Sequence, residues 1–409
     1  MSNESKMIDY RELVSRYSFA EHAERANRYF ASLDTDAVIT KKPFADPEEA
    51  AELCAGIGAL LRGLRIFPGA RVLDFGAGTC WLSRIFAMLG CEVTATDVSA
   101  QALELGRRVN DGDLIASRLS IDYVPLSESK LPFADGTFDR VICFDALHHV
   151  PDQLGAIAEF ARVLKDGGIA ALHEPGPEHS RHPQSQYEMR NHGVIEGDIR
   201  VEALFSKARA HGFSGAKLAV FSVAPVFSDL DGFNDFLADS SLSSPVACAL
   251  GQTVRDSFLA RRVFFLEKGD SSAHMDSRSR AGLHTAFNFK VEHLTGAVRV
   301  FGQVRNTGPV TWLPSGSGLG EVNLGVHLNG PDGRVIQFDY ARRPVSSHIV
   351  RPGEAVMMDV SVPYPGIAGE CSLVFDLVAE GVSWFELNGG DTVTVDISKQ
   401  PRGCPASGE

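Results

Sequence analysis

The stretch that most constrains the fold runs from residue 72 to residue 86. It begins with a mainly apolar run, VLDF at 72–75, passes through Gly76 and Gly78, and continues as a helical pattern from Trp81. A strand, a tight turn and a helix N-terminus in this order open a nucleotide-binding α/β unit. Glycine has no Cβ, so the backbone can turn sharply there and a ligand can lie against it.

A second apolar run, residues 93–96, ends at Asp97. A carboxylate at this place can accept hydrogen bonds from both hydroxyls of a ribose. The third glycine of a dinucleotide-binding fingerprint is missing, because Trp81 stands in its place. The pattern therefore favours a nucleoside without phosphates over a dinucleotide.

Five segments in a fixed order resemble the class I S-adenosylmethionine (SAM)-dependent methyltransferases. They read VLDFGAGT at 72–79, DVS at 97–99, LPFADGTFD at 131–139, FDALHHV at 144–150 and RVLKDGG at 162–168. The resemblance implies methyltransferase activity, SAM as the cofactor, and an α/β fold with a Rossmann-like seven-stranded sheet. It also implies the cofactor-binding residues Asp74, Gly76, Ala77, Gly78, Asp97, Val98, Phe144 and Asp145.

Within that resemblance each cofactor residue has an expected place. The glycines pass under the methionine part of SAM, and Asp74 braces their turn. Asp97 holds the ribose, Val98 packs on the adenine, and Phe144 and Asp145 line the methionine side. The acidic residue that many relatives place before the LPF motif is replaced here by SESK at 127–130. The contact with the adenine amino group therefore stays open, with Glu128 as one candidate.

Ligands of open α/β sheets bind beyond the carboxyl ends of the strands, and this rule selects the candidate catalytic residues. His148 and His149 follow the fourth strand, and Glu174 ends the fifth. A hydroxyl acceptor needs a base, for which histidine is suited near neutral pH. We expect His149 or His148 to be that base and Glu174 to orient it or the acceptor. The alternative is that both histidines only pack and bond to the backbone.

The segment after the fifth strand, residues 174–189, is predicted to be a long polar loop at the same rim. Side chains in and just beyond it could bind a polyhydroxylated acceptor, and the alternative is a solvated loop. The candidates are His179, Tyr187, Glu188 and Asn191, with Glu196 further along. Histidines and acids of this rim (His148, His149, Glu174, His179, His182) could also hold a divalent metal ion, but they lack a recognisable ligand spacing. The sequence therefore predicts no metal site.

Helical and strand patterns alternate through the first two thirds of the chain, which indicates a parallel sheet with crossover helices. Strands are expected at 71–75, 91–96, 119–124, 139–145, 168–174, 216–222 and 261–267. Helices are expected at 79–89, 99–109, 152–164 and 200–212, with two more inside 231–259. Further amphipathic helices at 7–32 and 47–65 precede the first strand. We predict an N-terminal helical cap at 1–45 and a methyltransferase domain at 46–268. The cap could be a lid over the SAM site or a helix pair that packs on the main domain.

Beyond residue 269 the pattern changes. Residues 269–282 are rich in serine and arginine and are predicted to be a flexible linker. Alternating apolar residues with turn signals then predict an all-β immunoglobulin-like sandwich at 283–398 and a tail at 399–409. The sandwich resembles modules of bacterial surface-polysaccharide enzymes, which implies a possible glycan-binding role. Trp312 and Trp384 could stack on sugar rings or anchor the core.

The composition of the chain argues against some classes of binding partner. The net charge of −13 argues against nucleic acid, and no apolar run reaches the ~20 residues that span a bilayer. Seven cysteines without a CxxC pair give no disulfide framework, which favours the cytoplasm. We expect SAM-dependent O-methylation of a sugar hydroxyl of a bacterial surface polysaccharide or its precursor. The alternatives are a small lipophilic or natural-product acceptor, and a non-catalytic SAM- or glycan-binding scaffold. The oligomeric state stays open.

Overall fold

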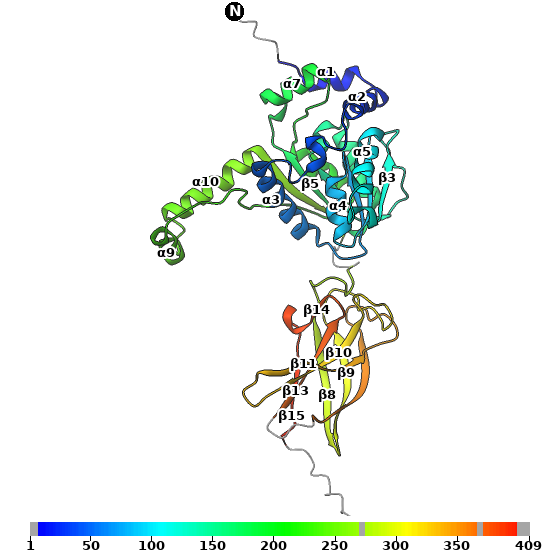
Figure 1. Cartoon of the computed structure of the whole chain (residues 1–409), viewed down its shortest axis with the longest axis vertical. Coiled ribbons are helices and arrows are strands. Elements are labelled where there is room, and N and C mark those ends of the chain that lie inside the picture. Colours follow the sequence, from blue (N-terminus) through cyan, green and yellow to red (C-terminus); the bar gives the residue numbers. More distant parts are fainter. Residues whose placement is uncertain (1–6, 270–274, 366–370, 399–409) are drawn as a thin grey trace, which may run out of the picture. The chain divides into compact units, whose positions relative to one another are not determined.

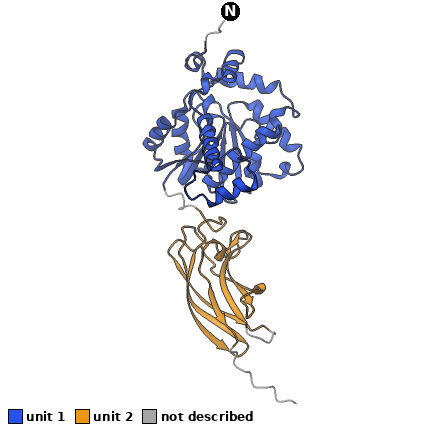
Figure 2. Cartoon of the chain, turned by 90° about the vertical axis from the view of Figure 1, so that its left-hand side faces the viewer, with its two compact units in different colours: residues 1–271 blue, residues 272–409 orange. Residues whose placement is uncertain are grey.

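A computed structural model describes residues 7–269, 275–365 and 371–398. The chain divides into two units, residues 1–271 (unit 1) and 272–409 (unit 2), which Figure 2 shows in different colours. The predicted tail at 399–409, the first six residues of the predicted cap and residues 270–274 of the predicted linker lie outside the described residues.

Unit 1 is built on one seven-stranded sheet with the order β3-β2-β1-β4-β5-β7-β6. Figure 1 labels β3 and β5 of this sheet. The first five strands run parallel, and β7 is antiparallel to both of its neighbours. The predicted Rossmann-like fold is thereby confirmed. The strands are β1 Arg71–Phe75, β2 Glu92–Asp97, β3 Ile121–Pro125, β4 Phe138–Phe144, β5 Leu164–Pro175, β6 Gly215–Leu218 and β7 Arg261–Glu267. β6 is shorter than the expected 216–222.

Helices pack against the sheet because each buries an apolar stripe. The buried residues of α3 are Leu53, Gly56, Ile57, Leu60 and Leu64, and its first turn is capped by the Asp46 carboxylate. Two apolar clusters result, one containing α6 and α8 and the other α3 and α4. The helices are α3 Pro47–Leu64, α4 Trp81–Met88, α5 Ala100–Asp111, α6 Gln153–Val163 and α8 Val201–Ala210, with short 3₁₀ turns η2 Ala116–Arg118 and η3 Leu147–His149.

The N-terminal segment folds as α1 Tyr10–Arg16, α2 Phe19–Ala31 and η1 Val38–Lys41. Ser18 and Glu21 form a reciprocal capping box that fixes the start of α2. Leu13 of α1 packs with Met189 and Ile195, which come from the segment after β5. The Thr79 hydroxyl donates to the Ile39 carbonyl at 3.3 Å, so the segment also contacts the glycine turn.

The segment after β5 is more ordered than the sequence predicted. It forms η4 His179–Arg181 and the helix α7 Pro183–Asn191, so the expectation of a loop through residue 189 is wrong. Pro183 occupies the first helical turn, and the His182 ring accepts a hydrogen bond from the Gln184 amide. The buried side of α7 consists of Ser185, Gln186 and Met189. A stripe with one apolar member carries no hydrophobic periodicity, which explains the error.

The two helices expected before the last strand are present as α9 Leu230–Ala238 and α10 Pro245–Ala260 (Figure 1). Neither contributes a buried residue. No helix in the part of the chain that the structure describes is long and apolar enough to cross a membrane.

Unit 2 consists of two antiparallel sheets, one of five strands and one of three, around a single apolar core. This agrees with the predicted sandwich. Trp312 and Trp384 are both buried, so they act as core anchors and present no open ring face to a sugar. The strands are β8 Thr285–Leu294, β9 Ala297–Asn306, β10 Val322–Asn329, β11 Val335–Pro344, β12 Ala355–Pro363, β13 Ser372–Ala379, β14 Ser383–Trp384 and β15 Val393–Asp396, with η5 at Glu386–Asn388.

Residues 275–282, which the sequence assigned to a flexible linker, pack onto unit 2. Met275 is buried among the core residues of the sandwich. Asp276 forms a β-bridge with Thr311, and the Ser277 hydroxyl donates to the Gly320 carbonyl at 2.6 Å. Hydroxyl hydrogen bonds and one methionine fix this segment, a combination that leaves no periodic pattern in the sequence.

Candidate functional site

The glycine turn after β1 has two glycines with different tasks. Gly76 (φ +71°) and Gly78 (φ +52°) both take left-handed backbone conformations. The amides of Gly76 and Ala77 donate to the Thr96 carbonyl at 2.8 and 2.9 Å, which ties the turn to β2. A Cβ on Gly76 would lie 2.3 Å from the Cβ of Ala146, whereas one on Gly78 would meet no described atom within 4 Å. Packing thus requires the first glycine, and the second leaves open space over the backbone.

Asp74 lies under this turn and is buried. The Ser83 hydroxyl donates to its carboxylate at 2.6 Å, and the Thr96 hydroxyl donates to its backbone carbonyl at 3.2 Å. Burial raises the pKa of Asp74 to about 6, partly offset by the Ser83 hydrogen bond and reinforced by the charge of Asp97. These contacts are those expected of a residue that braces the turn from below.

Asp97 ends β2 beside the turn and is partly buried. Its two carboxylate oxygens accept from the Gly78 amide at 2.9 Å and from the Ser99 amide at 2.8 Å. Burial raises the pKa of Asp97, and the amides of Ser99, Gly78 and Val98 act in the opposite direction. A carboxylate has about four lone-pair positions, so both oxygens can still accept from a ribose. Val98 is half-buried against the core.

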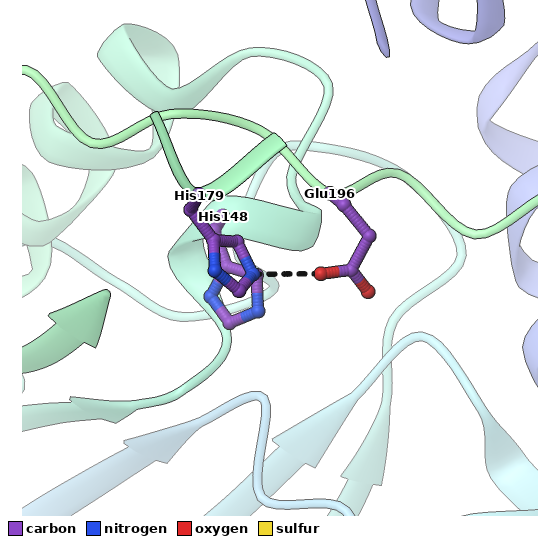
Figure 3. A group of neighbouring side chains, drawn as sticks. All are labelled: His148, His179 and Glu196. Atoms are coloured by element: carbon purple, nitrogen blue, oxygen red, sulfur yellow. Dashed lines mark hydrogen bonds and ion pairs between the residues drawn. The ribbon is translucent and has the colours of Figure 1, made fainter. Parts of the chain in front are cut away.

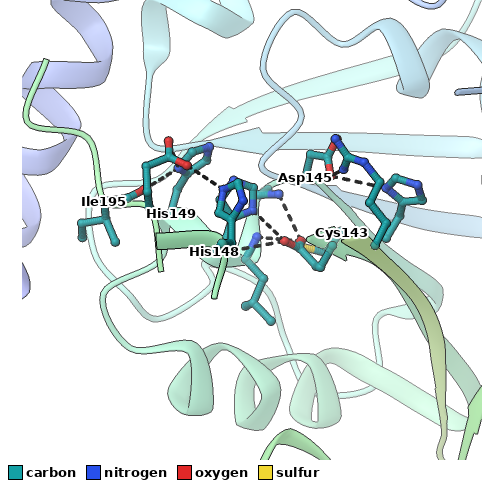
Figure 4. Close-up of polar contacts among 12 residues, drawn as sticks. Cys143, Asp145, His148, His149 and Ile195 are labelled. Atoms are coloured by element: carbon teal, nitrogen blue, oxygen red, sulfur yellow. Dashed lines mark hydrogen bonds and ion pairs between the residues drawn. The ribbon is translucent and has the colours of Figure 1, made fainter. Parts of the chain in front are cut away.

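Phe144 ends β4 and Asp145 follows it; Figure 4 labels Asp145. Phe144 stacks on the His173 ring with 4.0 Å between centroids and meets Trp81 edge-on. The Asp145 carboxylate pairs with the Arg261 guanidinium and lies 3.4 Å from His173 Nδ1. Burial would raise the pKa of Asp145, but the adjacent His173 ring and the charge of Arg261 lower it overall.

A pocket adjoins this group, between α3 and the segments that flank β7. It is lined by Lys42, Glu49, Glu52, Leu53, Gly56, Asp145, His173, Phe221, Val223, Ser257, Phe258, Arg261 and Val263. Of the predicted cofactor residues only Asp145 lines it, so the pocket is not the space over the glycine turn.

Glu174 has no exposed surface and fixes the turn that carries the two histidines. One of its oxygens accepts from the amides of Ala146 and Leu147 at 3.1 and 2.8 Å. The other accepts from the His148 amide at 3.3 Å and bonds to His148 Nδ1 at 2.8 Å (Figure 4). The Cys143 thiol also donates to Glu174 at 3.4 Å. These contacts are all internal, so Glu174 acts on η3 and cannot meet an acceptor directly.

His148 is buried against Glu174. Burial alone would lower the pKa of His148, but the hydrogen bond and charge of Glu174, with the charges of Asp145 and Glu196, raise it overall. Its ring lies 3.9 Å from the ring of His149 between centroids. A buried, charge-paired imidazole suits a positioning role.

His149 has the properties of a general base. Its side chain is 41% exposed, and its Nδ1 bonds to the Ile195 carbonyl at 2.6 Å. Because a carbonyl only accepts, this bond assigns the proton to Nδ1 and leaves the lone pair on Nε2. The part of the ring that the protein covers and the charge of His148 lower the pKa of His149, against the opposing effect of Glu196. The neutral imidazole therefore prevails at neutral pH.

A second polar group lies next to His148, shown in Figure 3. His179 Nε2 bonds to the Glu196 carboxylate at 2.7 Å, and its ring meets that of His148 edge-on at 4.9 Å. Burial would raise the pKa of Glu196, but His179 and His149 lower it overall. One donor atom each from His148, His179 and Glu196 lies within 4.8 Å of the others, a set that could hold a metal ion. The sequence named His182 and Glu174 for such a site, yet His182 caps α7 and Glu174 is bonded to η3.

Three predicted acceptor contacts lie on α7. Tyr187 is exposed, Asn191 donates to the Tyr187 carbonyl at 2.9 Å, and Glu188 accepts from Gln184 at 2.7 Å. These hydrogen bonds stay within the helix and do not reach His149.

Three neighbours of this site are not among the site residues that the sequence predicts. His173 lies at the end of β5, a place that the strand-end rule selects. The sequence predicts Glu196 only as an acceptor contact, whereas it pairs with His179 and lies 3.6 Å from His149 Nδ1. Arg261 gives no sequence signal, because it reaches Asp145 only through the antiparallel register that pairs it with Pro175.

Comparison with known proteins identifies the central part of unit 1. Residues 73–172 match the methyltransferase domain family. One relative is named ubiquinone biosynthesis O-methyltransferase, from Xanthomonas campestris pv. campestris (strain B100), and is 40% identical over 106 residues. That match covers 26% of this chain and 43% of the relative. Another, named demethylmenaquinone methyltransferase, from Renibacterium salmoninarum, is 38% identical over 107 residues, covering 26% and 42%.

The chain thus spans less than half the length of these two relatives. Among solved structures it is similar to a phosphoethanolamine N-methyltransferase 2 of Haemonchus contortus in complex with SAM. That similarity has a TM-score of 0.39 and 17% identity, and it covers 64% of this chain and 60% of the other.

Proposed function

We propose that the protein, whose unit 1 carries a class I SAM-dependent methyltransferase domain, transfers a methyl group from SAM to a hydroxyl oxygen of an acceptor beside His149. The observation that carries this proposal is the state of the His149 ring. Its Nδ1 proton is donated to a carbonyl, its Nε2 is a free base, and its side chain is exposed. A hydroxyl nucleophile needs such a base, because the neutral oxygen is weak and its proton must leave.

The residues around the glycine turn fit SAM. Open space over Gly78 and the carboxylate of Asp97 beside it can take the methionine part and the ribose, as in the expectation from the sequence. Asp74, at the end of β1, is bonded to Ser83 of α4 and to Thr96 of β2, the two elements next to the turn. When bound, SAM supplies an electrophilic methyl group on a sulfonium.

The chain's own contribution is to place the acceptor and to take its proton. His149 Nε2 accepts the hydroxyl proton as the oxygen becomes the nucleophile, and its exposed ring can pass that proton to solvent. Glu174 fixes η3 and, through His148, the position of the base. Holding reactants in line lowers the barrier by several kcal/mol, up to about 7–11, and a base contributes about 10²–10⁴-fold in rate.

For the acceptor we propose a small lipophilic molecule that bears a hydroxyl group. One relative is named as an O-methyltransferase of ubiquinone biosynthesis, which supports this class. Trp312 and Trp384 are buried, so neither tryptophan ring of unit 2 is available to stack on a sugar.

A sugar hydroxyl of a surface polysaccharide or its precursor is the second candidate. The polar pair of His179 and Glu196, close to His149, favours it, because such groups can bind neighbouring hydroxyls.

The test is transfer of labelled methyl from SAM into a host extract that is then separated into polysaccharide, lipid and small-molecule fractions. We expect label in the lipid or small-molecule fraction, greatly reduced with Asp97→Ala and His149→Gln. Label in polysaccharide would favour the second candidate. SAM binding without transfer to any fraction would contradict both and leave the scaffold. Parallel assays with EDTA show whether His148, His179 and Glu196 use a metal ion.

A further inference from the structure

Three elements of unit 2 bring together a second set of potential ligands. His327 comes from β10, Asp376 from β13 and Glu386 from η5. One donor atom of each lies within 4.8 Å of the others. Nothing in the proposed methyl transfer uses these residues.

His327 is the most informative member of the set. It is buried, and its Nδ1 bonds to the backbone carbonyl of Phe338. Because the carbonyl can only accept, the proton belongs to Nδ1 and Nε2 carries a lone pair. This Nε2 is buried and has no hydrogen-bond partner among the described residues. A buried polar atom without a partner is unfavourable, so its position needs an explanation.

The His327 ring is held in one orientation by aromatic neighbours. Its centroid lies 4.4 Å from that of Phe338 and 4.2 Å from that of Trp384. Gly325 allows this packing, since a Cβ there would lie 2.2 Å from the Trp384 ring. An imidazole with Nδ1 on a backbone carbonyl and Nε2 free has the arrangement that metal-binding histidines adopt in proteins.

The two carboxylates complete the set. Asp376 is buried, and its oxygens accept from the amides of Leu377 at 2.7 Å and Glu386 at 3.1 Å. Each oxygen retains a lone pair for a further partner. Glu386 is exposed, with an oxygen 3.9 Å from His327 Nε2.

We propose that His327, Asp376 and Glu386 bind a divalent transition-metal ion of the Zn²⁺ class, with solvent at a fourth position. One neutral imidazole and two carboxylates form a donor set that zinc uses. Two bonds of about 2.1 Å span at most about 4.2 Å, and the 3.9 Å between His327 Nε2 and the Glu386 carboxylate lies within that span. The ion would join η5 to β10 and β13 and stabilise unit 2.

The experiment measures Zn²⁺ binding by calorimetry on the full chain after removal of metal with a chelator. His179→Gln is present throughout, because it disables the other potential metal cluster in unit 1. We expect one equivalent of Zn²⁺ to bind and to raise the unfolding temperature. His327→Gln should weaken binding more than about 100-fold, since even outer partners of metal ligands are worth 10–100-fold.

Glu386→Gln provides the second variant, because its exposed side chain can be changed without disturbing the core. It should weaken binding at least about tenfold. His348→Gln, an exposed histidine of the same unit, is the matched control and should bind as its parent does. Cu²⁺ added to the parent should quench tryptophan fluorescence, because Trp384 lies next to His327. No bound Zn²⁺ in the parent, or equal binding by Glu386→Gln, would overturn the proposal and leave the proposed methyl transfer untouched.

Discussion

Replacing Glu174 with glutamine tests whether this buried carboxylate holds η3, the turn that carries His148 and His149, in place. If the amide oxygen keeps the bonds from Ala146 and Leu147, the new NH₂ group faces the His148 amide, and two donors meet. The buried amide then loses its partner, which costs about 1–3 kcal/mol. The charge-assisted bond to His148 Nδ1, 2.8 Å long, is lost as well and adds about 1.5–3 kcal/mol.

The combined loss of about 3–5 kcal/mol is what breaking a buried ion pair from one side costs. If the free energy of unfolding falls by about 3 kcal/mol per M urea for a unit of this size, the urea concentration at the unfolding midpoint should fall by about 1–2 M. Helical circular dichroism is the suitable signal, because the α-helices of the described residues all lie in unit 1.

Glu178→Gln is the matched control. Glu178 lies on the surface of the same segment, and its change should stay within about 0.5 kcal/mol. Glu174→Gln should also lower kcat, because His149 follows the turn that Glu174 fixes. If Glu174→Gln unfolds at the same urea concentration as the wild type, the assigned role of Glu174 is wrong.

Three further predictions concern the site. His149→Gln should lower kcat by about 10²–10⁴-fold. The wild-type rate should rise with pH below about 6.5, because the lowered pKa leaves His149 protonated only in acid, and the variant should lose this rise. Equal pH profiles of the two proteins would contradict this. Asp74 has a pKa of about 6 when folded and about 4 when unfolded, so the folded state holds its proton more tightly and stability falls as pH rises between these values. Asp74→Asn should therefore gain up to about 3 kcal/mol relative to wild type between pH 4 and pH 7 in urea titrations, and parallel pH dependences would refute it. Gly76→Ala should lose about 2–5 kcal/mol of free energy of unfolding, because its left-handed φ and the nearby Cβ of Ala146 both oppose a side chain. Gly78→Ala should lose less stability but more affinity for SAM, measured by calorimetry. The reverse order would contradict the two glycine roles.

Much of unit 1 follows from local patterns. The alternation of apolar runs with helical stripes gave the strands and helices, because a parallel sheet with crossover helices leaves that periodicity in the sequence. The strand-end rule also brought Glu174 and the two histidines to one rim. The rule could not say which histidine is the base, because that depends on their exposure. His149 is exposed and His148 is buried, and burial depends on the whole fold.

Other features leave no periodic signal. α7 buries Ser185 and Gln186 beside one methionine, and residues 275–282 are fixed by serine hydroxyls, so both were assigned to irregular structure. The sequence alone does not distinguish a core role of Trp384 from a sugar contact, because the difference lies in its burial. The His327 group depends on contacts between β10, β13 and η5 that no spacing of residues reveals.

The most direct test of the central proposal compares wild type with His149→Gln for both SAM binding and transfer of labelled methyl to the acceptor-containing fraction. The proposal predicts unchanged affinity for SAM, because His149 is not among the residues expected to hold it, together with a loss of transfer of about 10²-fold or more. Transfer by His149→Gln at the wild-type rate would contradict the assignment of His149 as the base for hydroxyl methylation.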